Sequence, residues 1–595
     1  MIMKNVGVKV CVVALVILNG ILLWDVLNVA YLLLLGYHAP DATLYWTIGQ
    51  NILNGLVPYV DIFENKPPVI FFLSAASFLL FSSPLLGNIL GASSMILMPA
   101  CIVLAAFNVT KNERIKSKSI SLFAALIFSL LLALYSFETA GGWQTEFFAS
   151  FFGVMYVISV AIPQGAKFSW MRLFFASLGM TLAVGTKEPF ILPLIASALL
   201  FSTSLRDMYV RIIFPIAIAS VVGVITLLIS GLYEPYIHTY LPTMLGMHIL
   251  RFQPPWVGGL QFEKAAIQLS SFSIFWLVSI VAMIAAPCIV RLTYLRSNPY
   301  LLGCLCSLLM WSMGRVAAGI FPFGLPGALI IVGGVVLYSF LMRSSLFSGW
   351  KEGLMPGLAW GASLYLAMSA VGISGDYQGH HFAFAVPFYA ALGIASLTQP
   401  VTRSVMMYRS LLLAILTVAS LHTALTFNRS DHFDAYQEQA QADEKAKKLA
   451  EDIDALLDAC HYSSYAFLGQ NTLQYYPYTK HSPDNFFIFS AYEHLTRYHP
   501  YVLSRSLEKL SNTPILIVPG ESYNPKGSLE SEEKFIQYFV LGIYHSFTNE
   551  IPACAEGKIP NGYTAFFRRK GQEGWFPVSL KNENGNWRIQ RRNSR

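Results

Sequence analysis

The stretch "PVIFFLSAASFLLFS", residues 68–82, decides how the chain is threaded through a membrane. It is apolar almost throughout, but it holds only 15 residues, with a Pro-Pro pair at its start and Ser-Ser-Pro at its end. A helix needs about 20 apolar residues to cross the hydrocarbon core of a bilayer. The stretch therefore predicts a short interfacial helix rather than a membrane span.

The composition of the whole chain sets the class of protein. Of its 595 residues, 55% are hydrophobic and only 12% are charged, whereas about 25% of an ordinary soluble protein is charged. Apolar runs of sufficient length predict a polytopic α-helical membrane protein with thirteen spans. These runs lie near residues 10–35, 85–107, 119–136, 147–162, 170–186, 189–204, 211–231, 267–290, 299–313, 325–342, 353–373, 382–398 and 410–427.

The distribution of Lys and Arg sets the orientation of these spans. When residues 68–82 are not counted as a span, sixteen basic residues fall in one set of loops and five in the opposite set. Because cytoplasmic loops are rich in Lys and Arg, we predict a cytoplasmic N-terminus and a C-terminus outside the cytoplasm. The same short clusters account for the net charge of +7, and the sequence has no basic stretch typical of nucleic-acid binding.

Residues 428–595 follow the last span and predict a soluble, extracytoplasmic α/β domain. The stretch "DAYQEQAQADEKAKKLAEDIDALLDAC" has a helical apolar period, and "TPILIVPG" and "GYTAFFRRK" are typical of strands. Cys460 and Cys554 are the only cysteines of this domain, and an oxidising compartment favours a disulfide between them. On the chain-entropy model such a bond contributes about 4 to 5 kcal/mol. Two unpaired buried thiols are the alternative.

Residues 1–427 form the predicted membrane domain, and carboxylates gather in its outer loops. The two long outer loops are residues 36–68 and 232–266. Between Pro40 and Gly55, the apolar period predicts a short amphipathic helix with Asp41 at its N-terminus. A carboxylate close to hydrocarbon is costly unless it is paired or lines a wet cavity. The pattern therefore favours an active site at the membrane edge.

Several motifs in these loops resemble one known family of enzymes. They are "PDATLYWTIGQNILNGLVPY" (40–59) followed by "KPP" (66–68), "MHILRF" (247–252) and, more weakly, "QTEFF" (144–148) and "GHHFAFAVPFYAAL" (379–392). The chain resembles, over about residues 10–427, the GT-C membrane glycosyltransferases that use polyprenyl-phosphate sugars. Within that family it is most similar to the bacterial lipid A aminoarabinose transferases and to relatives of the protein O-mannosyltransferases. The resemblance implies thirteen spans and an external C-terminal domain.

The resemblance implies roles for three residues of the two long loops. Asp41 would be the general base that activates the acceptor, while Lys66 and Arg251 would hold the phosphate of the donor. The chemistry agrees, because a phosphate is a good leaving group and the displacement needs a base but no acid. Asp41 could instead only cap a helix, and Lys66 could be a lysine that extends to the membrane surface.

A metal site is left open by the sequence. Some aminoarabinose transferases hold zinc with a glutamate directly before the lysine and a histidine three residues before the arginine. His248 matches, but Asn65 stands before Lys66 and Glu64 is one place out of register. Glu64 and His248 are therefore the candidate ligands of a divalent ion, or they have only hydrogen-bonding roles.

Five further residues are candidates for contacts with the donor sugar or the acceptor. They are Tyr59, Asp61, Glu146, His380 and His381. Each also has a simpler explanation, since an interfacial tyrosine can be a membrane anchor and Glu146 can stabilise a helix N-terminus.

Together these features predict a glycosyltransferase at the outer face of a bacterial inner (cytoplasmic) membrane. It would move a sugar from a polyprenyl-phosphate donor to a lipid, glycan or protein acceptor by an inverting displacement. The alternatives are an oligosaccharide transferase or ligase that uses a diphosphate-linked donor, and a flippase or transporter of lipid-linked sugars. A transporter predicts charges within the spans and an internal repeat, and we find no repeat in the sequence.

Overall fold

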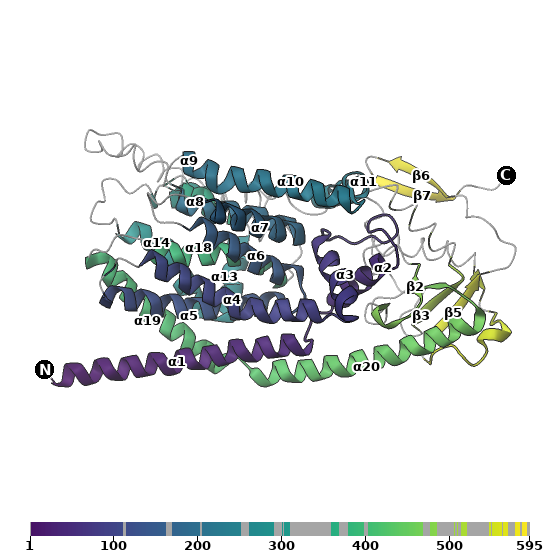
Figure 1. Cartoon of the computed structure of the whole chain (residues 1–595), viewed down its shortest axis with the longest axis horizontal. Coiled ribbons are helices and arrows are strands. Elements are labelled where there is room, and N and C mark those ends of the chain that lie inside the picture. Colours follow the sequence, from purple (N-terminus) through teal and green to yellow (C-terminus); the bar gives the residue numbers. More distant parts are fainter. Residues whose placement is uncertain are drawn as a thin grey trace. The chain divides into compact units, whose positions relative to one another are not determined.

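The structure is a computed structural model of the whole chain (Figure 1). It describes residues 2–110, 113, 115–161, 169–202, 205–250, 261–290, 300–301, 303–309, 357, 359–367, 379–397, 403–467, 476–484, 502, 505, 509, 513–519, 547–548, 550–561, 563–568, 578–583 and 586–591.

The chain divides into two compact units, each built from three stretches of sequence. Unit 1 comprises residues 1–39, 88–224 and 252–433, and unit 2 comprises residues 40–87, 225–251 and 434–595. The first outer loop and part of the second are thus grouped with the C-terminal part of the chain.

The regular secondary structure described in unit 1 is all helical. Its α-helices are α1 (Ile2–Leu35), α4 (Leu85–Val109), α5 (Ile115–Ala140), α6 (Thr145–Val160), α7 (Trp170–Thr186), α8 (Ile191–Phe201), α9 (Leu205–Met208), α10 (Phe214–Ile229), α13 (Gln261–Phe272), α14 (Ile274–Val290), α18 (Val386–Leu397) and α19 (Arg403–Thr426). Three short helices are tighter or wider than α: η1 (Glu188–Phe190), η2 (Tyr209–Ile213) and η6 (Gly379–Ala385). Helices α4 and α10 begin and end, respectively, in unit 2.

Small residues let the central helices of unit 1 pack closely. Helix α6 packs against both α7 and α18 (Figure 1). A Cβ atom on Gly179 of α7 would lie 2.8 Å from the backbone of Phe152 and of Tyr156 in α6, so only glycine fits at this crossing. The sequence "GHHFAFAVPFYAAL" forms η6 and the first part of α18, a helix in which almost every side chain is buried.

Six helices among the described residues are long and apolar enough to cross a membrane. They are Val12–Leu35, Leu85–Val109, Ser117–Ala140, Leu205–Ile229, His380–Leu397 and Val405–Thr426. Four shorter apolar helices, Val69–Phe81, Thr145–Val160, Glu188–Phe201 and Ile274–Ala286, accompany them. The chain is therefore a mostly helical membrane protein. The predicted span at 325–342 lies outside the described residues, and those at 299–313 and 353–373 do so in part.

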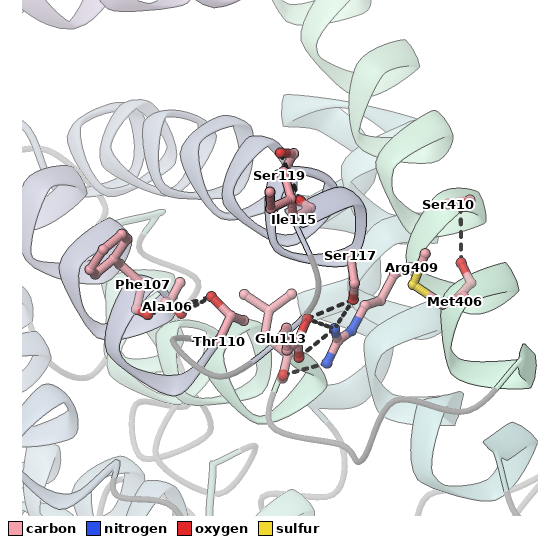
Figure 2. Close-up of polar contacts among 11 residues, drawn as sticks. Ala106, Phe107, Thr110, Glu113, Ile115, Ser117, Ser119, Met406, Arg409 and Ser410 are labelled. Carbon is pink, nitrogen blue, oxygen red and sulfur yellow. Dashed lines mark hydrogen bonds and ion pairs between the residues drawn. The ribbon is translucent and has the colours of Figure 1, made fainter.

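A buried ion pair joins α19 to the segment between α4 and α5 (Figure 2). The guanidinium of Arg409 is fully buried, and its Nη1 donates to both carboxylate oxygens of Glu113 at 2.7 Å. It also donates to Ser117 Oγ at 3.2 Å, and Nη2 donates to the carbonyl of Leu397 at 2.6 Å. One side chain thereby connects residues 113–117 to residues 397–409, which are far apart in the sequence.

Unit 2 contains the helices predicted in the first outer loop. Helix α2 (Ala42–Leu53) and helix α3 (Val69–Phe81) pack together at Gly49, where a Cβ atom would lie 2.6 Å from Ser74 Cβ. Helix α3 has 13 residues, which confirms that the stretch 68–82 forms a short helix. The second loop adds α11 (Tyr233–Pro235), the wide helix η3 (Tyr236–Tyr240) and α12 (Leu241–Leu250).

The C-terminal part of unit 2 combines a long helix with a mixed sheet. Helix α20 (Arg429–Cys460), whose first residues belong to unit 1, buries Ala446, Ala450, Ile453 and Leu457 on one face. The strands are β1 (Ser464–Phe467), β2 (Ser482–Pro483), β3 (Ile515–Pro519), β4 (Phe547–Thr548), β5 (Tyr563–Arg568), β6 (Val578–Glu583) and β7 (Asn586–Arg591), and short 3-10 turns are η7 (Tyr476–Tyr478) and η9 (Ala553–Ala555).

The order of the main sheet is β2-β1-β3-β5-β4, and β6 pairs with β7 in a separate hairpin. Strands β1 and β2, and β1 and β3, are parallel, whereas β5 is antiparallel to β3 and β4. The two strands predicted from sequence, β3 and β5, are therefore neighbours. The predicted disulfide between Cys460 and Cys554 is also confirmed, and it closes a loop with a sequence separation of 94.

Candidate active site

The stretch "VPYVDIFENKPP" forms a tight, buried turn between α2 and α3. A bridge between Pro58 and Ile62 closes the turn, and the Tyr59 N–H donates to the Ile62 carbonyl at 2.6 Å. Tyr59 has a φ of 66°, which is unfavourable for a residue with a side chain. Its hydroxyl donates to the Lys66 carbonyl at 2.7 Å, so the two ends of the turn are fixed to each other.

Lys66 is the central cation of this turn, and only 4% of its surface is exposed. Its Nζ lies 3.4 Å from Glu64 Oε1 and also donates to the side-chain carbonyl of Asn65. Pro68 is the N-cap of α3, and Lys66 stands two residues before it. The first N–H groups of a helix have no acceptor within that helix and carry a partial positive charge. A buried ammonium group beside such a helix N-terminus is suited to an anion, above all a phosphate.

Glu64 is the acidic partner in the turn. Its carboxylate is 1% exposed, and burial is the main cause that raises its pKa from 4.5 to about 7; Lys66 opposes the shift and Asp41 adds to it. Oε2 is buried and makes no hydrogen bond within the described part of the chain. The carboxylate is thus poorly solvated by the protein, and its charge near pH 7 depends on what else binds beside it.

Asp41 lies close enough to Glu64 to act on its pKa. It occupies the N-cap position of α2 and is half-buried, but its side chain makes no capping hydrogen bond. The explanation of Asp41 as a cap alone therefore has no support in the geometry. A carboxylate in this position can accept a proton from a hydroxyl that approaches the Lys66 turn.

Tyr59 is fully buried and stacks on the second outer loop. Its ring centroid is 4.7 Å from that of Tyr240 and 6.1 Å from that of Tyr236, both in η3. These contacts pack the Tyr59 turn against η3 and so join the two long loops. The structure gives Tyr59 a part in positioning Lys66, and its use as a contact for a sugar stays a prediction.

Asp61 is held by the C-terminal part of unit 2. Its Oδ2 accepts the N–H of Val57 at 2.9 Å, and its Oδ1 lies 3.5 Å from Arg505 Nη2 and 3.6 Å from Lys509 Nζ. Arg505 Nε also donates to the Val60 carbonyl at 3.3 Å. Arg505 and Lys509 follow Asp61 by more than 400 positions, and no motif in the sequence points to either of them. Their contacts fasten the turn and compete with any sugar for Asp61.

Unit 1 contains a second polar cluster, at the N-terminus of α6. Glu146 is fully buried in the first turn of α6, and its Oε1 lies 3.0 Å from Lys187 Nζ and 3.8 Å from His380 Nε2. The rings of His380 and His381 are 4.3 Å apart. The structure therefore joins three predicted site residues to Lys187, for which the sequence predicted no role. Contacts of the three with sugar or acceptor stay predictions.

The described residues include one set of side chains that could hold a metal ion. The ligand atoms of Glu146, His380 and His381 lie within 4.8 Å of one another, and two histidines with one carboxylate are a common zinc set. However, Lys187 pairs with Glu146 Oε1, the oxygen that lies 3.8 Å from His380 Nε2, and its positive charge opposes a cation. The fit is therefore poor while Lys187 is charged.

The ligand pair predicted from the sequence is only half described. Glu64 pairs with Lys66, whereas the side chain of His248 and the whole of Arg251 lie outside the described residues. Binding of a divalent ion by Glu64 and His248 therefore stays a prediction, and so does binding of the donor phosphate by Arg251.

The chain was also compared with known proteins. No family model and no curated protein matches it. Several chains of solved structures do, among them two structures of ArnT from Cupriavidus metallidurans. The structure bound to undecaprenyl phosphate shares 14% identity and a TM-score of 0.39, over 93% of this chain and 98% of that one. The apo structure shares 13% identity and a TM-score of 0.37, over 94% and 98%. Because both TM-scores lie below 0.5, the site is assigned from its own geometry.

Proposed function

We propose that the protein is a membrane glycosyltransferase of the GT-C type that takes a sugar from a polyprenyl-phosphate donor. The observation that carries the proposal is the buried Lys66 at the N-terminus of the short apolar helix α3, with Asp41 nearby. An ammonium group and a helix N-terminus together favour the phosphate. The apolar helix that follows would let the lipid tail remain in the bilayer.

The reaction is a single displacement at the anomeric carbon of the donor sugar. Asp41 accepts the proton of the acceptor hydroxyl or amine as the acceptor atom bonds to that carbon. The bond between the carbon and the phosphate oxygen breaks, and the electron pair leaves with the polyprenyl phosphate. Lys66 stabilises the charge that develops on this leaving group. Attack from the opposite side inverts the anomeric configuration.

The finer features of the architecture belong to the same proposal. They are thirteen spans with a cytoplasmic N-terminus, a catalytic domain of residues 1–427 and an extracytoplasmic domain of residues 428–595. The disulfide between Cys460 and Cys554 supports an oxidising compartment for the second domain. The membrane would be the inner membrane of a bacterium, and the acceptor a lipid, glycan or protein.

The proposal is tested with the purified full chain in lipid nanodiscs, a labelled polyprenyl-phosphate sugar and a membrane extract as the source of acceptor. We expect Lys66→Ala to weaken binding of the donor about 100-fold or more, because it removes a buried charge-assisted contact. Asp41→Asn should retain binding of the donor and lose about 100-fold or more in transfer rate.

Exposed residues of α20 supply the controls. Lys447→Ala and Asp452→Asn make the same chemical changes on the surface, and both should bind and transfer like the wild type. Full transfer by Asp41→Asn and Lys66→Ala would refute the proposal. A wild-type protein that carries the donor across the bilayer without consuming it would identify a transporter instead.

A further inference from the structure

A polar cavity of about 240 Å³ lies in unit 2 between α2 and the segment that leads into β2. The α2 side supplies a hydroxyl and three amides, and the other side supplies hydroxyls, a lysine and a histidine. The lining residues include Thr47, Gln50, Asn51, Asn54, Thr479 and Lys480. None of these residues belongs to the Lys66 turn or to the Glu146 cluster, so the cavity is separate from both of them.

The wall formed by residues 476–483 is firmly built. Gln50 Nε2 donates to the Pro477 carbonyl at 3.0 Å and ties α2 to this wall. The N–H of Lys480 donates to both oxygens of the buried Asp454, at 3.1 and 2.9 Å. The hydroxyls of Thr479 and Tyr465 are 2.7 Å apart. The cavity is therefore held open by its own hydrogen bonds and is not a loose gap between loops.

Asn51 is the most buried of the amides that line the cavity. Only 3% of this residue is exposed, and its amide lines the cavity. Within the described ranges, no hydrogen bond to this amide is found. The polar atoms of the amide are therefore open to the cavity, where a ligand that both donates and accepts hydrogen bonds would satisfy them.

The chemistry of the lining selects the class of ligand. Two carboxylates lie beside the basic residues of this wall: Asp458 Oδ1 is 2.9 Å from His481 Nε2, and Asp454 accepts the backbone N–H of Lys480. The cavity therefore favours a neutral ligand over a strong anion. Amides and hydroxyls around a volume of this size suit the hydroxyl groups of a sugar ring.

We propose that this cavity binds a neutral sugar unit of a glycan acceptor, an inference that rests on the proposed function. Asp41 is six residues before Thr47 on the same helix, or about 9 Å along its axis. A ring in the cavity is too far from Asp41 to be the ring that receives the donor sugar. The acceptor therefore has at least two sugar units, one that reacts at Asp41 and another that is held beside Asn51.

The test uses the labelled full chain in nanodiscs, applied to an array of bacterial surface glycans and of short Ser- and Thr-containing peptides. We expect the wild type to bind glycans of two or more sugars and none of the peptides. Asn51→Leu should weaken this binding about tenfold or more, because a hydrogen-bonding group that reads the sugar is lost. Gln437→Leu makes a comparable change on the exposed face of α20 and should bind like the wild type.

A second variant guards against misfolding of Asn51→Leu. Asn54 lines the cavity but is exposed, so Asn54→Trp should fill the cavity without disturbing the core. It should also raise the KM for a glycan found on the array by about tenfold. Equal binding of glycans by both variants, or binding of peptides alone, would overturn the inference.

Binding of undecaprenyl phosphate is measured on the same samples to separate the two proposals. It should be the same in Asn51→Leu and the wild type, because the phosphate site does not use the cavity. Normal binding of the phosphate lipid with no glycan effect would refute the acceptor site alone. Binding of the phosphate lipid that is indifferent to Lys66→Ala would refute the proposed function.

Discussion

Two buried ion pairs, one in each unit, differ in how completely their partners are satisfied. In unit 1, Arg409 meets both oxygens of Glu113 at 2.7 Å and makes further hydrogen bonds to Ser117 and Leu397. In unit 2, Lys66 lies 3.4 Å from one oxygen of Glu64, whose other oxygen makes no hydrogen bond within the described residues. The first arrangement holds segments together. The second leaves one carboxylate oxygen of Glu64 without a hydrogen bond within the described residues.

The largest effect should come from breaking the pair in unit 1. Arg409→Met leaves Glu113 without its cation and should lower the free energy of unfolding by about 3 to 5 kcal/mol, as is typical of a buried pair that loses one member. Thermal unfolding of the purified protein measures this loss. The double variant Arg409→Met with Glu113→Gln should recover part of it, because no charge remains buried. Equal stability of Arg409→Met and the wild type would show that the pair does not hold the fold.

The equivalent change in unit 2 should affect ligand binding and not stability. Lys66→Met should weaken the affinity for undecaprenyl phosphate about 100-fold while the free energy of unfolding changes by less than about 1 kcal/mol, because Glu64 can become neutral by taking up a proton. Binding by native mass spectrometry and thermal unfolding give the two values. A loss of stability as large as that of Arg409→Met would make Lys66 a structural residue.

The metal-ligand set in unit 1 offers a smaller effect. Lys187→Met removes the cation that pairs with Glu146 and should strengthen binding of Zn²⁺ about tenfold, because like-charge repulsion is lost. Competition with a fluorescent zinc chelator measures the change. His380→Ala in the Lys187→Met background should abolish the gain. Zinc affinity that does not depend on Lys187 would show that the set does not bind the ion.

The smallest effect concerns how the affinity for the donor phosphate depends on pH. Because the pKa of Glu64 is raised to about 7, the carboxyl gains a negative charge as pH rises from 6 to 8 and competes with a phosphate for Lys66. Affinity for a non-hydrolysable phosphodiester analogue of the donor, whose own charge is constant over this range, should fall about fivefold. Glu64→Gln should remove the dependence. The free energy of unfolding should also fall as pH rises. A raised carboxyl pKa makes folding less favourable above pH 7 than below pH 4.5. A flat profile in the wild type would contradict this role of Glu64.

Local patterns allowed much of the fold to be predicted. The amphipathic period after Asp41 predicted α2, and the short apolar stretch after Lys66 predicted α3. Apolar stretches typical of strands predicted β3 and β5. The expected oxidising compartment predicted the disulfide between Cys460 and Cys554. These features depend on residues near one another in the sequence or, for the disulfide, on the small number of cysteines.

The contacts that shape the site could not be predicted in this way. Arg505 and Lys509 reach Asp61 from the far end of the chain, and Lys187 is 41 residues from Glu146. The positive φ of Tyr59 is also hidden, because a tyrosine carries no local signal for that conformation. Long-range pairing and strain depend on the whole fold, whereas the sequence records only the residue types.

The most direct test of the role of Lys66 is a cryo-EM structure of the full chain in nanodiscs with undecaprenyl phosphate. We predict that the phosphate lies within about 2.7 to 3.2 Å of Lys66 Nζ, at the N-terminus of α3. A phosphate bound instead by Lys187 and His380, with the Lys66 turn unchanged, would contradict the assignment.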